Sequence, residues 1–348
     1  MPVRVAVVGA TGVVGRTILR ILEERDFPVD ELRCLASSRS AGRASLPFRG
    51  RLDPVGLATP EAFRGCRVAL FSAGAAAARA LAPAAVAAGC RVVDNSSAFR
   101  QDPGTPLVVP EVNGSHLDGH PTVVANPNCS TIQLTVALAP LHHAFGLRRL
   151  HVATYQAASG AGRALMEALR LQSREIADGG TPTAAAYPHP LAGNVVPGGW
   201  RTEGHATEEE AKIVAETRRI LELPNLPIGC TTVRVPVAVG HAEAVWAAFE
   251  CAVAPAEARD LLERSPGVQV LDDLEQDRYP TPLVAAGTDP VYVGRIRADL
   301  GEPGALSLFV VADNLRKGAA LNAVQIAERL MEAPELAPDP GVAARPFL

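Results

Sequence analysis

The stretch VRVAVVGATGVVGRTILRILEER, residues 3–25, decides the fold of the N-terminal part. A continuous Val/Ala run predicts a buried strand, and apolar residues at 18, 19, 21 and 22 predict a helix after it. Between them, Gly9, Gly12 and Gly15 form G-x-x-G-x-x-G, a dinucleotide-binding pattern whose middle glycine comes one position late. The stretch predicts a site for a pyrophosphate at the helix N-terminus, with a plain strand-to-helix turn as the alternative.

Size and composition place the chain among globular proteins. Its 348 residues are enough for two domains, and 48% hydrophobic with 20% charged residues is ordinary for such proteins. The net charge of −4 and the lack of a basic face argue against a nucleic-acid partner. The Ala-rich stretch 68–90 is interrupted by Gly74, Arg79 and Pro83, so no membrane span is expected. The 6 cysteines are scattered, which favours the cytoplasm over a disulfide framework and gives no metal motif.

Strand and helix patterns alternate through the first part of the chain. Strands are expected at 31–37, 66–74, 90–97 and 122–129, with helices at 77–89 and 130–146. We expect Pro140 to kink or split the latter helix. The alternation predicts an α/β fold with a doubly wound parallel sheet of the Rossmann type.

The pattern changes near residue 150. A strand, a glycine turn and a helix cover 150–176, a Pro/Gly-rich loop covers 179–199, and a charged helix covers 207–222. Alternating residues at 230–253, with a bend at Gly240, and a hairpin at 290–314 around GEPG indicate an α+β domain with a mixed or antiparallel sheet. We expect the helix at 315–332 to return to the first domain. The predicted domains are 1–129 with 314–348, which bind the cofactor, and 130–313, which bind substrate and dimerise.

The end of the second strand favours NADP over NAD. An NAD enzyme places a carboxylate there, whereas Ser37, Ser38, Arg39 and Ser40 offer a charge and hydroxyls suited to a 2′-phosphate. The acidic pair at 30 and 31 is expected to lie before the strand. A solvated polar loop is the alternative interpretation.

Cys129 follows Asn-Pro-Asn and precedes a predicted helix in ANPNCSTIQL, residues 125–134. A free cysteine is more often buried than reactive. At a helix N-terminus, however, the dipole lowers a thiol pKa, and beside a nicotinamide cofactor such a thiolate suggests acyl transfer through a thioester. Cys129 is therefore a candidate nucleophile.

Eight motifs together give the chain a resemblance to the aspartate-semialdehyde dehydrogenases. In order, they are GATGVVG (9–15), SSRSAG (37–42), DNSSAFR (94–100), NPNCST (126–131), TYQAASGAG (154–162), EEEAK (208–212), VRVPVAVGH (233–241) and DNLRKGAALNAVQ (313–325). They run through essentially the whole chain, and NPNCST is the most specific. The resemblance implies NADP-dependent reductive dephosphorylation of aspartyl 4-phosphate to aspartate semialdehyde and phosphate, on the route to lysine, threonine and methionine. It also implies a homodimer and needs no metal.

The resemblance also assigns roles to individual residues. Cys129 becomes the nucleophile, His241 the acid/base and Gln156 the residue that orients substrate or intermediate. Substrate-binding residues would be Arg234 for the α-carboxylate, Glu209 for the ammonium, and Lys212, Arg100 and Asn128 for the phosphate. A solvated helix face is the alternative for the acids of EEEAK. The implied cofactor-binding residues are Gly9, Thr11, Gly12, Val13, Val14, Gly15, Ser37, Arg39, Ser40, Ser72, Ala73, Gly74, Asn95, Ser159, Gly160 and Asn314.

Two departures and two alternatives stand beside this resemblance. His205 replaces an aromatic residue usual before the acidic helix, and HPLAGNVVPGGW, residues 189–200, differs from the usual form. N-acetyl-γ-glutamyl-phosphate reductases share the fold and chemistry, but their cysteine usually follows Asn-Pro-Gly and precedes Tyr. An inactive relative with a binding role is disfavoured because Cys129, Gln156, Arg234 and His241 are all present.

Overall fold

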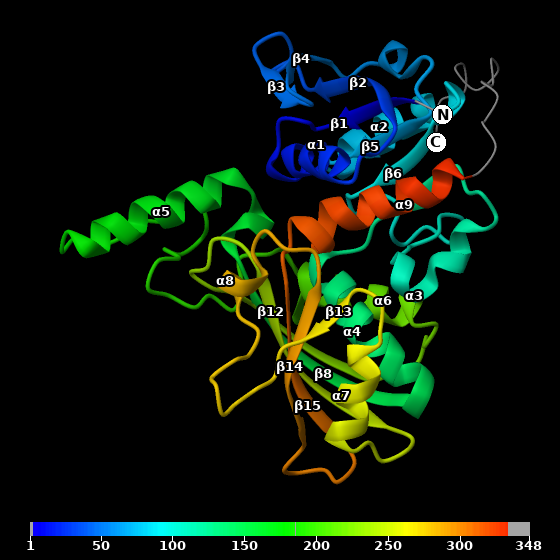
Figure 1. Ribbon diagram of the computed structural model, residues 1–348. Coiled ribbons are helices and arrows are strands. Elements are labelled where there is room, and N and C mark those ends of the chain that lie inside the picture. The colour runs from blue at the N-terminus through cyan, green and yellow to red at the C-terminus, as the bar shows by residue number, and fades with distance from the viewer. Residues whose placement is uncertain (1–2, 185, 333–348) are drawn as a thin grey trace. The chain divides into compact units, whose positions relative to one another are not determined.

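The computed structural model describes residues 3–184 and 186–332, and these form two compact units (Figure 1). The first unit contains described residues 3–127 and 319–332, and the second contains 128–318. The units therefore meet along the chain at 127/128 and 318/319 rather than at 129/130 and 313/314. Asn314 belongs to the second unit because its side chain accepts hydrogen bonds from Ser159 and Gly240. Residues 333–348 of the predicted first domain lie outside the described residues.

The first unit is built on a seven-stranded sheet with the order β3-β4-β2-β1-β5-β6-β7. All its neighbouring strands are parallel except β3, which pairs antiparallel with β4. Its elements are β1 (Val3–Val8), α1 (Val13–Glu24), β2 (Val29–Ala36), β3 (Ser45–Phe48), β4 (Arg51–Leu57), η1 (Pro60–Phe63), β5 (Val68–Phe71), α2 (Ala75–Ala87), β6 (Arg91–Asp94), α3 (Pro110–Asn113), η2 (Gly114–Leu117), β7 (Val123–Ala125) and α9 (Leu321–Met331). The doubly wound sheet expected from the sequence is confirmed.

The continuous apolar sequence of β1 follows from burial on both faces of this sheet. Val5 and Val7 join one core cluster with residues of α1 and α9, while Ala6 and Val8 join another with residues of α2. The C-terminal helix α9 packs in the first unit, as expected, and contacts α1 there. Asp30 and Glu31 lie inside β2, so their expected place before the strand was wrong; Arg33 donates to Glu31 at 2.8 Å.

The second unit is built on a six-stranded mixed sheet with the order β11-β8-β12-β15-β14-β13. Its elements are α4 (Cys129–Phe145), β8 (Leu147–Gln156), η3 (Ala158–Ala161), α5 (Arg163–Ala177), β9 (Thr202–Glu203), β10 (Ala206–Thr207), α6 (Glu208–Ile220), β11 (Ile228–Arg234), β12 (His241–Phe249), α7 (Pro255–Glu263), β13 (Val268–Val270), α8 (Pro282–Ala285), β14 (Val291–Ala298) and β15 (Leu306–Ala312). A short π-helical segment, η4 (Arg316–Ala320), precedes α9. The mixed sheet agrees with the prediction, but Pro140 does not split α4.

Helices α4, α6 and α7 contact strands of this second sheet. Buried and more exposed side chains alternate along these strands, so one face of the sheet packs against the core and the other is more open. Tyr155, Trp246 and Phe309 lie on the open face. A hollow of about 570 Å³ lies there, lined by residues of β8, β11, β12, β14 and β15. Within residues 3–184 and 186–332, no helix combines the length and apolar character that a membrane crossing requires.

Candidate active site

Cys129 is the first residue of α4 and is partly exposed. The side chain of Asn128 caps this helix by accepting hydrogen bonds from the backbone N–H groups of Ser130 and Thr131, at 2.9 and 3.4 Å. Gly318 lies against the cysteine, because a Cβ built on that glycine would be 3.1 Å from Cys129 Cβ. The candidate nucleophile therefore sits at a capped helix N-terminus, where the helix dipole favours an anion.

Three strand ends of the second sheet bring the other candidate residues together. Gln156 ends β8, Arg234 ends β11 and pairs with Gln156 in the ladder, and His241 begins β12. Gln156 Nε2 lies 3.3 Å from Ser130 Oγ and 3.3 Å from Glu209 Oε1. Ser130 is the residue after Cys129 in the chain. All three of these strand-end residues are at most 2% exposed.

The main chain of Ala157 holds both His241 and Arg234. Its N–H donates to His241 Nδ1 at 3.0 Å, and its carbonyl accepts from Arg234 Nη1 at 2.8 Å. An imidazole whose Nδ1 accepts a hydrogen bond carries its proton on Nε2 when neutral. Burial lowers the pKa of His241 well below its usual range, and the Arg234 charge lowers it further. His241 therefore offers Nε2–H as a donor.

Gly160 leaves room beside these two side chains. A Cβ there would lie 3.0 Å from both Arg234 Nη1 and His241 Nε2, closer than ordinary contact allows. Neither His241 Nε2 nor Arg234 Nε has a hydrogen-bond partner among the described residues, although both atoms are buried. Buried donors without partners are uncommon and mark the space next to Gly160 as a place for an acceptor ligand.

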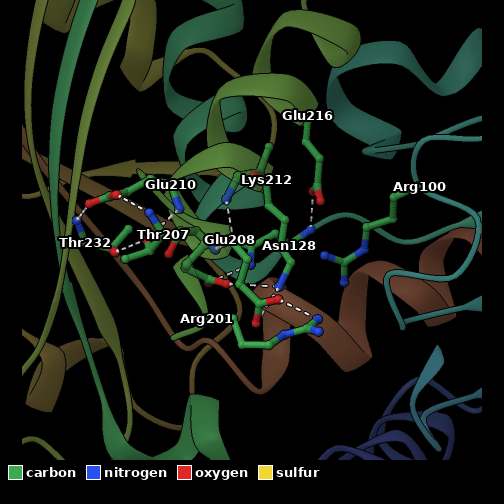
Figure 2. Close-up of polar contacts among 12 residues, drawn as sticks. Arg100, Asn128, Arg201, Thr207, Glu208, Glu210, Lys212, Glu216 and Thr232 are labelled. Carbon is green, nitrogen blue, oxygen red and sulfur yellow. Dashed lines mark hydrogen bonds and ion pairs between the residues drawn. The ribbon is translucent and has the colours of Figure 1, made fainter. Parts of the chain in front are cut away.

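Helix α6 presents the candidate charged residues from its first two turns (Figure 2). Asn128 Nδ2 donates to Glu209 Oε1 at 2.8 Å, and Lys212 Nζ lies 3.6 Å from the other Glu209 oxygen. Glu209 is only 6% exposed, so it is not part of a solvated face. Lys212 also lies 3.6 Å from Glu208, which pairs with Arg201.

Sequence reasoning missed Glu216, which is fully buried and accepts the backbone N–H of Asn128 at 2.6 Å (Figure 2). Glu209, Lys212 and Glu216 are spaced as i, i+3 and i+7, so the helical period was the signal that could have found it. It also missed Glu243 on β12, a carboxyl that is fully buried. Burial raises the pKa of Glu243 well above its usual range, opposed by the neighbouring Gln133 amide and Ser130 hydroxyl.

In the first unit, the candidate cofactor residues gather at one edge of the sheet. Gly9 follows β1, Ser37 follows β2, Ser72 follows β5 and Asn95 follows β6, so all four lie at carboxyl ends of parallel strands. Ligands of doubly wound sheets bind at this edge. Thr11, Val13 and Val14 belong to the turn and first residues of α1, and Ala73 and Gly74 precede α2.

The glycine turn fits a pyrophosphate. Gly9 has φ +83°, and a Cβ on it would lie 2.3 Å from the Ser72 carbonyl oxygen, while one on Gly15 would lie 2.2 Å from the Gly9 carbonyl oxygen. Helix α1 begins without a side-chain cap or an acidic residue in its first turn, so its first N–H groups suit an anion. Ser37 and Arg39 are exposed in the turn after β2, and Ser40 is half-buried there.

The remaining candidates divide between the units. Arg100 belongs to the first unit, where it is buried and donates to the Asn95 carbonyl at 2.9 Å. Ser159, Gly160 and Asn314 belong to the second, where Ser159 Oγ donates to Asn314 Oδ1 at 2.9 Å. Their cofactor roles and the phosphate role of Arg100 stay predictions. His205 lies exposed in the turn between β9 and β10.

Comparison with known proteins agrees with both units. The family model "Semialdehyde dehydrogenase, NAD binding domain" matches residues 4–120, and "Semialdehyde dehydrogenase, dimerisation domain" matches residues 138–317. The chain belongs to the semialdehyde dehydrogenase family. Aspartate-semialdehyde dehydrogenase of Aquifex aeolicus is 48% identical over 339 residues, which cover 95% of this chain and 99% of that protein. The Synechocystis enzyme of the same name is 46% identical over 95% of this chain and 98% of its own.

Solved structures of the family give the same result. Aspartate semialdehyde dehydrogenase II from Vibrio cholerae has a TM-score of 0.92 and 42% identity, and covers 95% of this chain and 99% of its own. A second Vibrio cholerae structure, described as complexed with ASA, has a TM-score of 0.91 and 41% identity over the same shares. As a semialdehyde dehydrogenase, the chain is an oxidoreductase with a domain for a nicotinamide cofactor.

Proposed function

We propose that this oxidoreductase reduces aspartyl 4-phosphate to aspartate semialdehyde and phosphate with NADPH, through a thioester on Cys129. The main support is the joint anchoring of His241 and Arg234 by Ala157, one residue after Gln156. Gln156 in turn reaches Ser130, the neighbour of Cys129. A sulfur nucleophile, a guanidinium and a proton donor are thus gathered in one unit. The Aquifex aeolicus and Synechocystis relatives are both named aspartate-semialdehyde dehydrogenase.

Acyl transfer begins at Cys129. Its thiolate attacks the acyl carbon, a C–S bond forms, the bond from that carbon to the phosphate oxygen breaks, and phosphate leaves with the bonding electrons. A nicotinamide cofactor, when bound, would supply the hydride that reduces the thioester. The C–S bond then breaks, which releases the aldehyde and returns the thiolate of Cys129.

His241 is proposed to stabilise the oxygen that becomes negative in the tetrahedral states. Nε2–H is a buried donor without a partner among the described residues, and such donors are worth most where water is excluded. Because Nδ1 already accepts the Ala157 N–H, a neutral His241 acts first as a hydrogen-bond donor. Its expected acid/base role requires that contact to open, so that Nδ1 can also carry a proton.

Substrate charge matches the charged side chains group by group. Arg234 offers a planar fork for the α-carboxylate, and Glu209 offers a buried carboxylate for the α-ammonium. Lys212 and Asn128, which both contact Glu209, are proposed for the phosphate. For Arg100 of the first unit, the phosphate role rests on the family resemblance alone. An N-acetylated substrate lacks the ammonium and would leave Glu209 without its proposed partner.

NADP is the proposed cofactor because Ser37, Arg39 and Ser40 follow β2 where an NAD enzyme carries an acid. A related solved structure, from Candida albicans, is described with NADP and has a TM-score of 0.74 at 26% identity. Gly9, Gly12 and Gly15 would hold the pyrophosphate, and Ser72 to Gly74 would line the same strand edge.

We also propose a homodimer that forms through the open face of the second sheet. Tyr155 is 37% exposed, and Trp246 and Phe309 are partly exposed beside it, so a second copy would cover apolar surface. The match of residues 138–317 to a dimerisation domain supports a dimer formed through the second unit. We place the enzyme in the cytoplasm because its cysteines are free among the described residues.

One set of progress curves tests the proposed reaction. Purified protein is given aspartate semialdehyde and NADP with and without inorganic phosphate, then NAD in place of NADP. We expect phosphate-dependent NADP reduction and slower NAD reduction. Faster oxidation of N-acetylglutamate semialdehyde would favour the reductase alternative. Cofactor binding without any aldehyde oxidation would favour an inactive relative.

A further inference from the structure

Two aromatic rings lie against Arg234, and the proposed reaction gives them no role. The guanidinium carbon is 4.8 Å from the ring centre of Trp200 and 5.7 Å from that of Tyr187. The two rings meet edge to face, with centres 6.4 Å apart and planes at 88°. A cation at these distances is attracted to the ring face, and more strongly when it is removed from water. Arg234 is only 2% exposed.

The segment 187–200 that carries both rings also holds the main chain of Arg234. Val196 and Arg234 exchange two backbone hydrogen bonds, at 2.9 and 2.8 Å, in an antiparallel bridge. The segment is anchored in turn by buried Gln172 of α5, whose side-chain oxygen accepts the N–H groups of Leu191 and Ala192. Arg234 is therefore fixed by its backbone and its side chain through one segment.

Glycine makes this packing possible. Gly199 has φ +91°, and a Cβ on it would lie 2.2 Å from Cζ of Tyr187. Tyr187 also donates its hydroxyl to the Gly198 carbonyl at 2.5 Å. The sequence Gly-Gly-Trp at 198–200 thus lets a tyrosine ring and a tryptophan ring pack on the same guanidinium.

The rings leave part of the guanidinium for a ligand. Nη1 donates to Ala157, while Nε has no partner among the described residues. On the basis of the function proposed above, we propose that Trp200 and Tyr187 are positioning residues that fix the Arg234 guanidinium for the substrate α-carboxylate. Rings on the cation exclude water and restrict its rotation, and both effects strengthen a two-point carboxylate contact.

Kinetics with two aldehydes test this role. Aspartate semialdehyde carries the α-carboxylate, and 3-aminopropanal is the same molecule without it. In Trp200→Leu we expect KM for aspartate semialdehyde to rise about tenfold, with kcat within about twofold and KM for 3-aminopropanal unchanged. Trp200→Phe retains a ring and should restore most of the affinity. An equal loss for both aldehydes, or no loss, would overturn the proposal.

Trp246→Leu is the matched control. Trp246 also lies against an arginine of the second unit: the guanidinium carbon of Arg149 is 5.1 Å from the centre of its ring. The substitution removes this contact. Any rise in KM in this variant should be equal for the two aldehydes. A carboxylate-selective loss here as large as in Trp200→Leu would also contradict the proposal.

Fluorescence provides a readout that does not depend on turnover. The chain has 2 tryptophans, so Trp246→Phe leaves Trp200 as the single reporter. When this variant is titrated without cofactor, we expect a saturable change in the Trp200 emission with aspartate semialdehyde and no change with 3-aminopropanal. If the wild type fails to oxidise aspartate semialdehyde, the proposed function fails while this titration still reports on Arg234. Unchanged emission with both aldehydes would overturn the positioning role.

Discussion

Ala157 donates its backbone N–H to Nδ1 of His241 at 3.0 Å, in a site where the imidazole is fully buried. Burial and the Arg234 charge lower the pKa of His241 well below its usual range, so the imidazole is neutral at neutral pH. This state has consequences for the pH dependence of activity.

The first prediction concerns the acid limb of the pH–rate profile. Because the pKa of His241 is lowered, kcat/KM should not fall with an apparent pKa near the ordinary histidine value of about 6.5. His241→Gln should lose at least about 100-fold in kcat at pH 7. The measurement is kcat/KM from pH 5 to 8. An acid limb near 6.5 that disappears in His241→Gln would contradict the buried, neutral imidazole.

Replacement of Cys129 tests the proposed nucleophile. Cys129→Ala should reduce kcat by at least about 10³-fold, because it removes the sulfur nucleophile at the N-terminus of α4. NADP affinity, measured by titration of the cofactor, should stay near that of the wild type. The control is Cys251→Ala, which removes an exposed cysteine of the same unit and should keep full activity. Substantial turnover by Cys129→Ala would disprove the thioester route.

Two neighbouring acids on α6 should behave differently. Glu209→Gln removes the buried carboxylate proposed for the substrate ammonium, so KM for aspartate semialdehyde should rise at least about tenfold. Glu208→Gln removes a carboxylate that pairs with Arg201 near the surface, and KM should change by less than about twofold. Steady-state kinetics give KM for aspartate semialdehyde in both variants. An equal rise in KM in the two would contradict the proposed role of Glu209.

Glu243 should make stability depend on pH. Its folded-state pKa is raised by burial, so above about pH 4.5 the unfolded chain releases a proton that the folded chain keeps. This difference lowers stability as pH rises toward the folded-state pKa. Glu243→Gln stays neutral and should raise the melting temperature by at least about 2 °C more at pH 8 than at pH 5. The same shift at both pH values would argue against a protonated Glu243.

Arg39 should set the preference for NADP. It is exposed in the turn after β2, and the proposed function assigns it to the 2′-phosphate of NADP. Arg39→Ala should raise KM for NADP about tenfold and leave KM for NAD unchanged. Arg51→Ala, on exposed β4 of the same unit, is the control for loss of a surface charge. Parallel losses with both cofactors would place the 2′-phosphate elsewhere.

Patterns within single elements could be predicted from the sequence. The apolar run of β1 and the spacing in α1 and α9 follow directly from burial, whereas the cap that Asn128 gives α4 was not predicted. The β3–β4 hairpin was missed because Pro47 and Pro54 disguise its strands. Pro47 lies in the edge strand β3, where a missing donor is tolerated, whereas Pro54 lies in β4, between β3 and β2.

The site was only partly accessible to sequence reasoning, since several contacts depend on distant packing. Trp200 and Tyr187 are far from Arg234 in sequence, and no local pattern relates them to it. Glu243 lies two positions after His241 in an alternating strand, so the period alone predicts a buried side chain but not its polar neighbours. The role of Ala157 is carried by its main chain and leaves no side-chain signal.

The main-chain contacts of Ala157 affect how a mutational survey of this enzyme should be interpreted. Alanine scanning skips residue 157, since it is already alanine, and substitutions that keep the backbone path retain both the amide and the carbonyl. Proline differs from every other replacement because it lacks the N–H, and it would release the imidazole of His241 while leaving the Arg234 contact in place. A residue that holds two proposed site residues through its main chain can thus tolerate most substitutions in such a survey, and proline alone would reveal its role.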